Sequence, residues 1–209
     1  MFFRKSKADG SGSKGKKPAS PIDFLIVGLG NPGKKYEGTR HNAGFAALEA
    51  LAEKLGVKVR KSKYKALTAE ASIGDKRVLL MMPQTFMNLS GQAVTEAMQF
   101  YKLKPEQVLI LLDDITLPVG VLRIRRKGSD GGQRGMRSII TLSGSEQFPR
   151  IKIGVGQKPR PDYDLAAWVL SKFTGEEAAK MLDAFQNAAD AACKIVQGDL
   201  EGAMNAYSR

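Results

Sequence analysis

The sequence predicts an α/β fold: a single-domain, three-layer sandwich with a twisted, mostly parallel mixed sheet and helices on both of its faces. Short apolar runs typical of buried strands alternate along the chain with segments whose apolar residues recur on one helical face. In addition, 43% of the 209 residues are hydrophobic, which suffices for one well-filled core. We expect the folded domain to span residues 21–209, after a disordered basic tail over residues 1–20 that is rich in Lys, Gly and Ser.

The first half of the chain predicts a strand, a helix and a hairpin. Phe24–Val27 is a continuous apolar run that stops at a glycine, as in a buried strand. A helix follows from about Ala43 to Gly56, because the apolar residues between them share one helical face. Residues 57–73 and 76–82 are predicted strands, joined as a hairpin across the Gly-Asp pair between them.

The second half continues the alternation of strands and helices. A loop over 83–90 comes first, with Ser90 as the N-cap of a helix that runs to about Leu103. A strand over 107–112 and an alternating strand over 121–127 follow, and then a glycine-rich loop over 128–135 that leads into a short helix. The chain ends with a strand over 151–155, a helix over 175–197 and a short final helix.

Polar residues follow several of the predicted strands. Asn31, the loop of residues 83–90 and Asp113 each come after one, and His41 lies just before the first helix. In open α/β sheets, ligands bind at the carboxyl ends of the strands. We therefore expect these four segments to meet at one edge of the sheet.

His41 is the only histidine, and an unperturbed imidazole titrates near pH ~6.5, so it is the natural group for proton transfer at neutral pH. Its neighbours Arg40 and Asn42 are polar, which favours a site over a buried structural histidine. A histidine base needs a partner that fixes its tautomer, and Asp113 is well placed for this. The alternative for Asp113 is a turn former, and for Asp114 a turn former is our preferred interpretation.

The loop Thr85–Ser90 has two interpretations. The Asn88 amide is suited to holding a substrate carbonyl or an oxyanion. Alternatively, Phe86 and Met87 fill the core and Ser90 caps the next helix. Sequence reasoning leaves both open.

The run Gly28–Gly33 matches the pattern GxGxxG after a strand, so a dinucleotide site has to be considered. However, the helix does not begin until about Ala43, and Lys58-Val59-Arg60-Lys61 stands where an acidic residue would hold a ribose. Basic residues there could receive a 2′-phosphate, so NADP stays open as a weak alternative.

The charge indicates a polyanionic partner. The net charge is +12, of which residues 1–20 contribute +5 from six Lys or Arg and one Asp, so the rest of the chain carries +7. The alternative is a charge that only favours solubility. A basic set with few acids among it is suited to a phosphate backbone: Arg123, Arg125, Lys127, Arg134, Arg137, Arg150 and Lys152.

Several protein classes are disfavoured. No apolar run approaches the ~20 residues needed to span a bilayer, and the apolar start stops at once in Arg4, without a signal-peptide core. Cys193 is the only cysteine, which excludes an internal disulfide framework and favours the cytoplasm. With one His and one Cys, a metal site is not expected.

Six motifs occur in order along the chain: GLGNPG, TRHNAGF, TFMNLSG, DDxxLPxG, GSDGG and FPRIKIGVG. Together they resemble the bacterial-type peptidyl-tRNA hydrolase family, from about Ile22 to the C-terminus. The resemblance implies a cytoplasmic, monomeric esterase that needs no metal or cofactor. Its substrate would be peptidyl-tRNA released in abortive translation, from which it frees the peptide so that the tRNA is recycled.

The resemblance also implies roles for individual residues. His41 would be the base that activates water, with Asp113 supporting it. Asn88 would hold the water or the peptide carbonyl, and Asn31 would bind the blocked aminoacyl end and reject free aminoacyl-tRNA. The 3′ end of the tRNA would contact Tyr36 and Phe86, and the peptide channel would contain Met87.

The chain departs from the family pattern at two places. Gln133-Arg134 replaces a His-Asn pair whose Asn contacts substrate, so Arg134 would bind a phosphate instead or substrate binding there would be weaker. Thr116 replaces an acid. Neither change touches His41 or Asp113, so we expect activity to survive. The competing functional class is a non-catalytic RNA-binding homologue that resembles organellar splicing factors. A dehydrogenase, the enzyme class that the GxGxxG match would indicate, is the third alternative.

Overall fold

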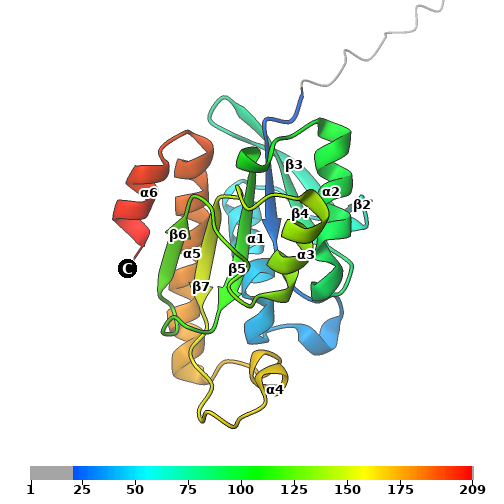
Figure 1. Ribbon diagram of the computed structural model, residues 1–209. Coiled ribbons are helices and arrows are strands. Elements are labelled where there is room, and N and C mark those ends of the chain that lie inside the picture. The colour runs from blue at the N-terminus through cyan, green and yellow to red at the C-terminus, as the bar shows by residue number, and fades with distance from the viewer. Residues whose placement is uncertain (1–20, 209) are drawn as a thin grey trace, which may run out of the picture.

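The computed structural model describes residues 21–208, so the basic tail expected over residues 1–20 lies outside the described residues. Within this range the strands form a single seven-stranded sheet in the order β2-β3-β4-β1-β5-β7-β6 (Figure 1). Their bounds are Phe24–Gly28 for β1, Lys61–Lys63 for β2, Ala66–Ile73 for β3, Lys76–Pro83 for β4, Val108–Asp114 for β5, Leu122–Arg125 for β6 and Arg150–Gly154 for β7.

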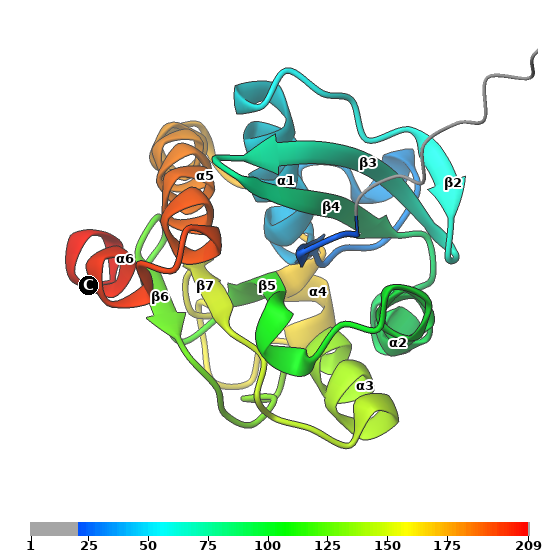
Figure 2. The same cartoon turned by 90° about the horizontal axis from the view of Figure 1, so that it is seen from above.

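The predicted three-layer α/β sandwich is confirmed. One core lies between the sheet and α1, α5 and α6, and a second lies between the sheet and α2 and α3 (Figure 2). The helices run over Ala43–Lys54 (α1), Ser90–Tyr101 (α2), Arg134–Ser143 (α3), Leu165–Val169 (α4), Gly175–Val196 (α5) and Leu200–Tyr207 (α6). Short 3-10 turns are η1 (Lys34–Tyr36), η2 (Arg40–Asn42), η3 (Met87–Leu89) and η4 (Pro105–Gln107).

The centre of the sheet is parallel. The strands β4, β1, β5 and β7 pair side by side in parallel, whereas β2, β3 and β6 join through antiparallel pairings. Every residue of β5 is buried, as expected for a strand covered by helices on both faces. Because the four central strands point the same way, the segments that follow them leave from one edge of the sheet.

The structure corrects the single strand predicted over residues 57–73. This segment contains the short edge strand β2 and the longer strand β3, which form a hairpin turning at Tyr64 and Lys65. Both turn residues have positive φ, 53° and 52°. A two-residue turn of this kind usually carries Asn or Gly, and neither residue stands here to indicate the turn.

Two details around the helices also differ from the prediction. Ser90 is the first residue of α2 rather than its N-cap, and its hydroxyl donates a hydrogen bond to the Met87 carbonyl at 2.9 Å. The five-residue helix α4 was not predicted at all. It lies beyond the carboxyl ends of the central strands (Figure 1).

A close approach of backbones sets the position of α1. A Cβ atom on Gly44 would lie 2.3 Å from the Leu111 carbonyl oxygen and 2.6 Å from the Leu29 nitrogen. Only glycine therefore lets the first turn of α1 rest directly on the ends of β1 and β5. This contact holds the preceding turn, η2, at the edge of the sheet where the central strands end.

No helix within residues 21–208 has the length and apolar character that a membrane crossing requires.

Candidate active site

A cavity of about 450 Å³ opens at the carboxyl ends of the central strands. Five segments enclose it: the end of β5, the loop after β1 with η2, the loop around η3, the glycine-rich loop with the start of α3, and α4. Its lining includes Asn31, His41, Phe86, Met87, Asn88, Asp113, Asp114, Gln133, Arg134 and Lys152. The structure thus brings together the segments that the strand-end argument expected to meet.

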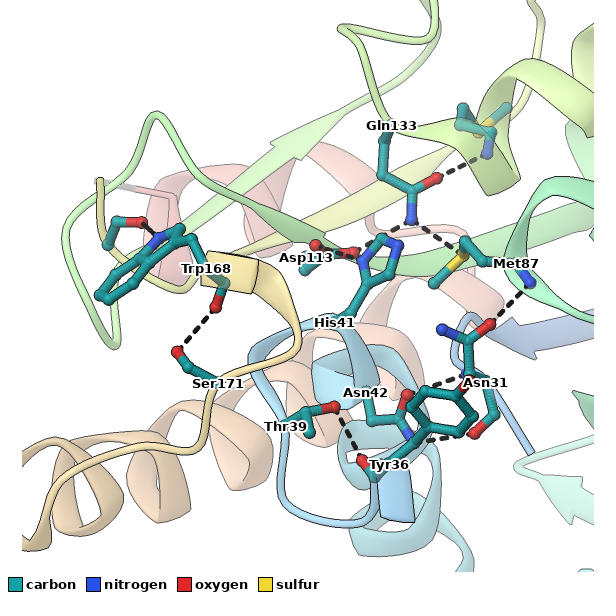
Figure 3. A network of polar contacts seen from close by, with 12 residues as sticks. Asn31, Tyr36, Thr39, His41, Asn42, Met87, Asp113, Gln133, Trp168 and Ser171 are labelled. Carbon is teal, nitrogen blue, oxygen red and sulfur yellow. Dashed lines mark hydrogen bonds and ion pairs between the residues drawn. The ribbon is translucent and has the colours of Figure 1, made fainter. Parts of the chain in front are cut away.

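His41 and Asp113 form a hydrogen-bonded pair in the wall of the cavity. The imidazole Nδ1 lies 2.8 Å from the Asp113 Oδ2, and the two side chains are 13% and 3% exposed (Figure 3). A carboxylate accepts hydrogen bonds only, so Nδ1 carries the proton in the neutral ring. The Nε2 atom, which makes no hydrogen bond within residues 21–208, is then an unprotonated acceptor at the edge of the cavity.

The pKa of His41 reflects opposing influences. Burial disfavours the imidazolium and lowers it, whereas the charge and the hydrogen bond of Asp113 raise it. The positive charge of Arg134 acts in the same direction as burial. The charge and the hydrogen bond of Asp113 together outweigh burial and Arg134, so the pKa of His41 lies above its ordinary value of 6.5.

Gln133 holds the other oxygen of Asp113. Its Nε2 donates to Asp113 Oδ1 at 3.0 Å and lies 3.2 Å from the Met87 sulfur, while its Oε1 accepts the Met136 backbone N–H at 2.7 Å (Figure 3). The last contact makes Gln133 the N-cap of α3. The expectation that the change at Gln133 leaves the His41–Asp113 pair untouched is therefore wrong, because Gln133 contacts Asp113 directly.

Asn31 and Asn42 form a reciprocal pair that ties together the loops around the cavity. The Asn31 backbone N–H donates to Asn42 Oδ1 at 2.9 Å, and Asn42 Nδ2 donates to the Asn31 carbonyl at 3.0 Å. The Asn31 side-chain Oδ1 in turn accepts the Met87 backbone N–H at 2.8 Å. The Asn31 Nδ2 group has no partner among residues 21–208 and is therefore available to a ligand in the cavity.

Arg40 anchors the segment around α4. This buried guanidinium donates to the Val155 carbonyl at 2.8 Å and pairs with Glu177 at 2.8 Å. It also stacks 3.8 Å from the centre of the Trp168 ring, whose Nε1 donates to Gly156. Arg40, noted from the sequence only as a polar neighbour of His41, thus connects η2 with the wall that α4 contributes to the cavity.

Asp114 acts as the predicted turn former. Its Oδ1 accepts hydrogen bonds from the Thr116 backbone N–H and hydroxyl, and its Oδ2 pairs with Lys152 at 2.9 Å. Burial works to raise the pKa of Asp114, but the hydrogen bonds from Thr116 and Lys152 outweigh it and hold that pKa below its usual value. Thr116, which departs from the family pattern, therefore donates both its backbone N–H and its hydroxyl to this turn.

The outer face of β6 and β7 is basic. Arg123 lies opposite Lys152 and Arg125 opposite Arg150 in the antiparallel register, so all four start from the same face. Arg125 is exposed and Arg123 half-buried. The prediction that Arg150 binds phosphate is wrong, because its side chain is buried. It donates hydrogen bonds to the carbonyls of Phe148, Ser129 and Glu146 and thereby holds the glycine-rich loop.

The remaining candidates occupy different positions. Phe86 and Asn88 are exposed at the rim of the cavity, and Arg134 is exposed at the start of α3. Met87 is buried in the second core but still reaches the cavity. Tyr36 is half-buried in η1 and is not among the cavity-lining residues. The loop interpretation thus holds in part: Met87 fills the core, whereas Phe86 does not.

The first two glycines of the GxGxxG match serve packing. A Cβ on Gly28 would lie 2.4 Å from the Gly44 carbonyl oxygen, and one on Gly30 would lie 2.6 Å from the Phe45 ring. Helix α1 and Phe45 pack directly on these two glycines, and α1 begins only at Ala43, well after the pattern ends at Gly33, which argues against the dinucleotide alternative. Within residues 21–208, no three His, Cys, Asp or Glu side chains are grouped to hold a metal ion.

Comparisons with known proteins identify the family of this chain. The family described as Peptidyl-tRNA hydrolase matches residues 25–209. A peptidyl-tRNA hydrolase from Agathobacter rectalis is 50% identical over 186 residues, which cover 88% of this chain and 100% of the relative. One from Alkaliphilus oremlandii is 51% identical over 185 residues, covering 88% and 98%. The crystal structure of peptidyl-tRNA hydrolase from Acinetobacter baumannii superposes with a TM-score of 0.84 at 36% identity, covering 90% of this chain and 98% of that one.

Proposed function

The chain belongs to the peptidyl-tRNA hydrolase family, and from this we propose that it hydrolyses the ester bond between a peptide, or an N-blocked amino acid, and tRNA. The observation that carries the proposal is the His41–Asp113 pair, with the free Nε2 at the edge of a cavity large enough for the end of such a substrate. An RNA-binding homologue without catalytic activity would have no need of this pair.

In the proposed reaction His41 is the general base. Its Nε2 takes a proton from a water molecule as the water oxygen attacks the carbonyl carbon of the ester. Asp113 keeps the proton on Nδ1 and stabilises the imidazolium that forms. When the tetrahedral intermediate collapses, the carbon–oxygen bond to the terminal ribose breaks and His41 returns the proton to the ribose oxygen. The products are a free peptide carboxylate and tRNA.

Two amides are proposed to bind the reacting groups. The Asn31 Nδ2 is free to donate to the carbonyl oxygen of the blocked aminoacyl end, while its Oδ1 is already occupied by the Met87 N–H. Asn88 is exposed at the rim and is proposed to hold the attacking water or the peptide carbonyl. Preorganised donors of this kind stabilise a developing oxyanion.

The tRNA is proposed to lie over the basic side of the cavity. Arg134, Lys152, Arg123 and Arg125 extend from the cavity over the face of β6 and β7 and are suited to phosphate groups. Phe86, exposed at the rim, offers a ring on which a 3′-terminal base can stack. Tyr36 is retained as a more distant contact to the same end, and Met87 as part of the peptide channel. We further propose that the protein acts as a cytoplasmic monomer.

The proposal is tested by measuring release of N-acetyl amino acid from acetyl-aminoacyl-tRNA in EDTA. Wild-type protein is expected to turn over the substrate, and His41→Ala to lose roughly 10²–10⁴-fold in kcat, the usual contribution of a general base. The variant should still bind tRNA, since the basic face is unchanged. Absence of wild-type turnover, with tRNA still bound in a salt-sensitive manner, would leave an RNA-binding homologue.

A further inference from the structure

Gln133 contacts three separate parts of the candidate active site. Its side chain joins Asp113 at the end of β5, Met87 in η3 and the Met136 backbone in the first turn of α3. The space around it is tight, because a Cβ on Gly135 would lie 2.6 Å from the Met87 sulfur and 3.0 Å from Gln133 Oε1. The side chain thus fits closely between its neighbours.

The contact with α3 fixes which way the amide faces. The Met136 N–H is a donor, so the Gln133 atom that receives it must be the carbonyl oxygen. The NH₂ group is then turned toward Asp113 and Met87. Gln133 is consequently a hydrogen-bond donor to Asp113, and it cannot exchange this role for that of an acceptor without breaking the cap of α3.

This donor controls the orientation of the Asp113 carboxylate. A carboxylate held at Oδ2 alone is free to turn about its Cβ–Cγ bond, whereas one held at both oxygens is not. Asp113 is 3% exposed, so water is a poor substitute for the lost donor. The plane of the carboxylate, and with it the direction of the His41 ring, depends on Gln133.

We infer that Gln133 is a positioning residue for the His41–Asp113 pair: it locks the carboxylate so that Oδ2 stays directed at Nδ1 and Nε2 stays directed into the cavity. The inference rests on the proposed function of that pair. It gives the glutamine that departs from the family pattern a definite task, separate from any contact with substrate. The competing explanation is that Gln133 only caps α3.

Gln133→Ser separates the two explanations. A serine hydroxyl is as good an N-cap as any side chain but is too short to reach Asp113. We expect the serine variant to stay folded and to show roughly a tenfold lower kcat, with KM within about twofold, because a hydrogen bond to a buried charge is lost. Gln147→Ser, the same change at an exposed position outside the cavity, is the control and should leave kcat unchanged.

Gln133→Glu is the second variant, in case the serine protein does not fold. Its carboxylate retains an acceptor for the Met136 N–H and is favoured at a helix N-terminus, but it cannot donate to Asp113. Its negative charge also stabilises the imidazolium of His41. We expect a lower kcat and an acidic limb of the pH–rate profile displaced to higher pH. Wild-type kcat in either folded variant overturns the inference.

The ¹⁵N signals of the His41 ring give a readout that does not need activity. Since the chain has a single histidine, an untagged protein gives one pair of imidazole nitrogen signals. The wild type is expected to show the Nδ1–H tautomer, and Gln133→Ser a mixture of tautomers. An unchanged tautomer in Gln133→Ser contradicts the positioning role even if the wild type proves inactive, so this failure is distinct from that of the proposed function.

Discussion

At the scale of single residues, the proposed chemistry depends on how Asp113 shifts the pKa of His41. Burial alone would make the imidazole a weaker base than a free one, because it disfavours the charged form. The carboxylate at 2.8 Å reverses this and keeps the ring in one tautomer. In the proposed reaction, the raised pKa makes His41 a stronger base toward water than a buried imidazole without such a partner.

Asp113→Asn is expected to reduce kcat by about 10²–10⁴-fold, because an amide can present its NH₂ to Nδ1 and favour the wrong tautomer. It also removes the charge that raises the pKa of His41, so that pKa should fall. An NMR titration of the single histidine in the wild type and the variant measures this directly. A pKa that is equal in both proteins would show that Asp113 does not act on His41.

The same substitution changes the pH dependence of stability. A histidine whose pKa is raised on folding stabilises the folded state most below its unfolded pKa of ~6.5, and this contribution is lost as the pH rises through the folded pKa. Urea unfolding should therefore show a larger destabilisation of Asp113→Asn at acidic than at alkaline pH.

At this scale the sequence predicted His41, Asp113 and Asn31 as neighbours, because all three stand next to ends of predicted strands or helices. It did not reveal Gln133 as the second partner of Asp113, since 20 residues and a loop of unpredictable conformation separate the two. Nor did it reveal that Arg150 is buried. The alternation of basic and apolar residues along a strand is the same whether the basic side chain is exposed to water or buried against loop carbonyls.

At the scale of secondary-structure elements, the position of α1 determines where His41 lies. The helix rests on the strand ends through Gly44, only three residues after His41. Any side chain at Gly44 would have to displace the helix from the backbone of β1 and β5. The geometry of the base is thus fixed by helix packing as well as by its hydrogen bond.

Gly44→Ala is expected to lower the free energy of unfolding by about 1–3 kcal/mol through overpacking and to reduce kcat by moving His41. Gly175→Ala is the matched control, because a Cβ there meets no atom within 4 Å and the residue is also at the start of a helix. It should be neutral or slightly stabilising. Chemical denaturation and the ester assay compare the two. Equal stability and activity would contradict the close packing.

Strands with continuous apolar runs, such as β1 and β5, and helices with clear apolar periodicity, such as α5, were predictable from the sequence. The β2–β3 turn was not, because Tyr64 and Lys65 adopt positive φ without glycine or asparagine to signal it. Helix α4 was missed because five residues carry too little periodicity. Arg40, stacked on Trp168, secures this short helix, and such a long-range contact leaves no local pattern.

At the scale of the whole molecule, part of the positive charge within residues 21–208 lies on one face of the sheet. The outer face of β6 and β7 adjoins the cavity through Lys152, while the opposite face of these strands packs on α5 and α6. A tRNA whose 3′ end enters the cavity would therefore pass over Arg123 and Arg125. Electrostatic attraction to this face should supply much of the affinity.

Arg125→Gln is expected to weaken tRNA binding and to reduce the slope of log K against log salt concentration by about 0.7–0.9, the loss of one phosphate contact. Arg126→Gln is the control with the same charge change, because Arg126 extends from the alternate position and pairs with Glu201 of α6 at 2.6 Å. It should leave the slope nearly unchanged. Identical slopes for the two variants would exclude a specific phosphate contact at Arg125.

The pH dependence of kcat/KM for hydrolysis of acetyl-aminoacyl-tRNA in EDTA shows whether neutral His41 is the base. This quantity reports the ionisations of the free enzyme. We predict an acidic limb whose midpoint lies above 6.5 and coincides with the pKa of His41. A limb with a different midpoint, or a rate that does not fall on the acidic side, would show that another group activates the water.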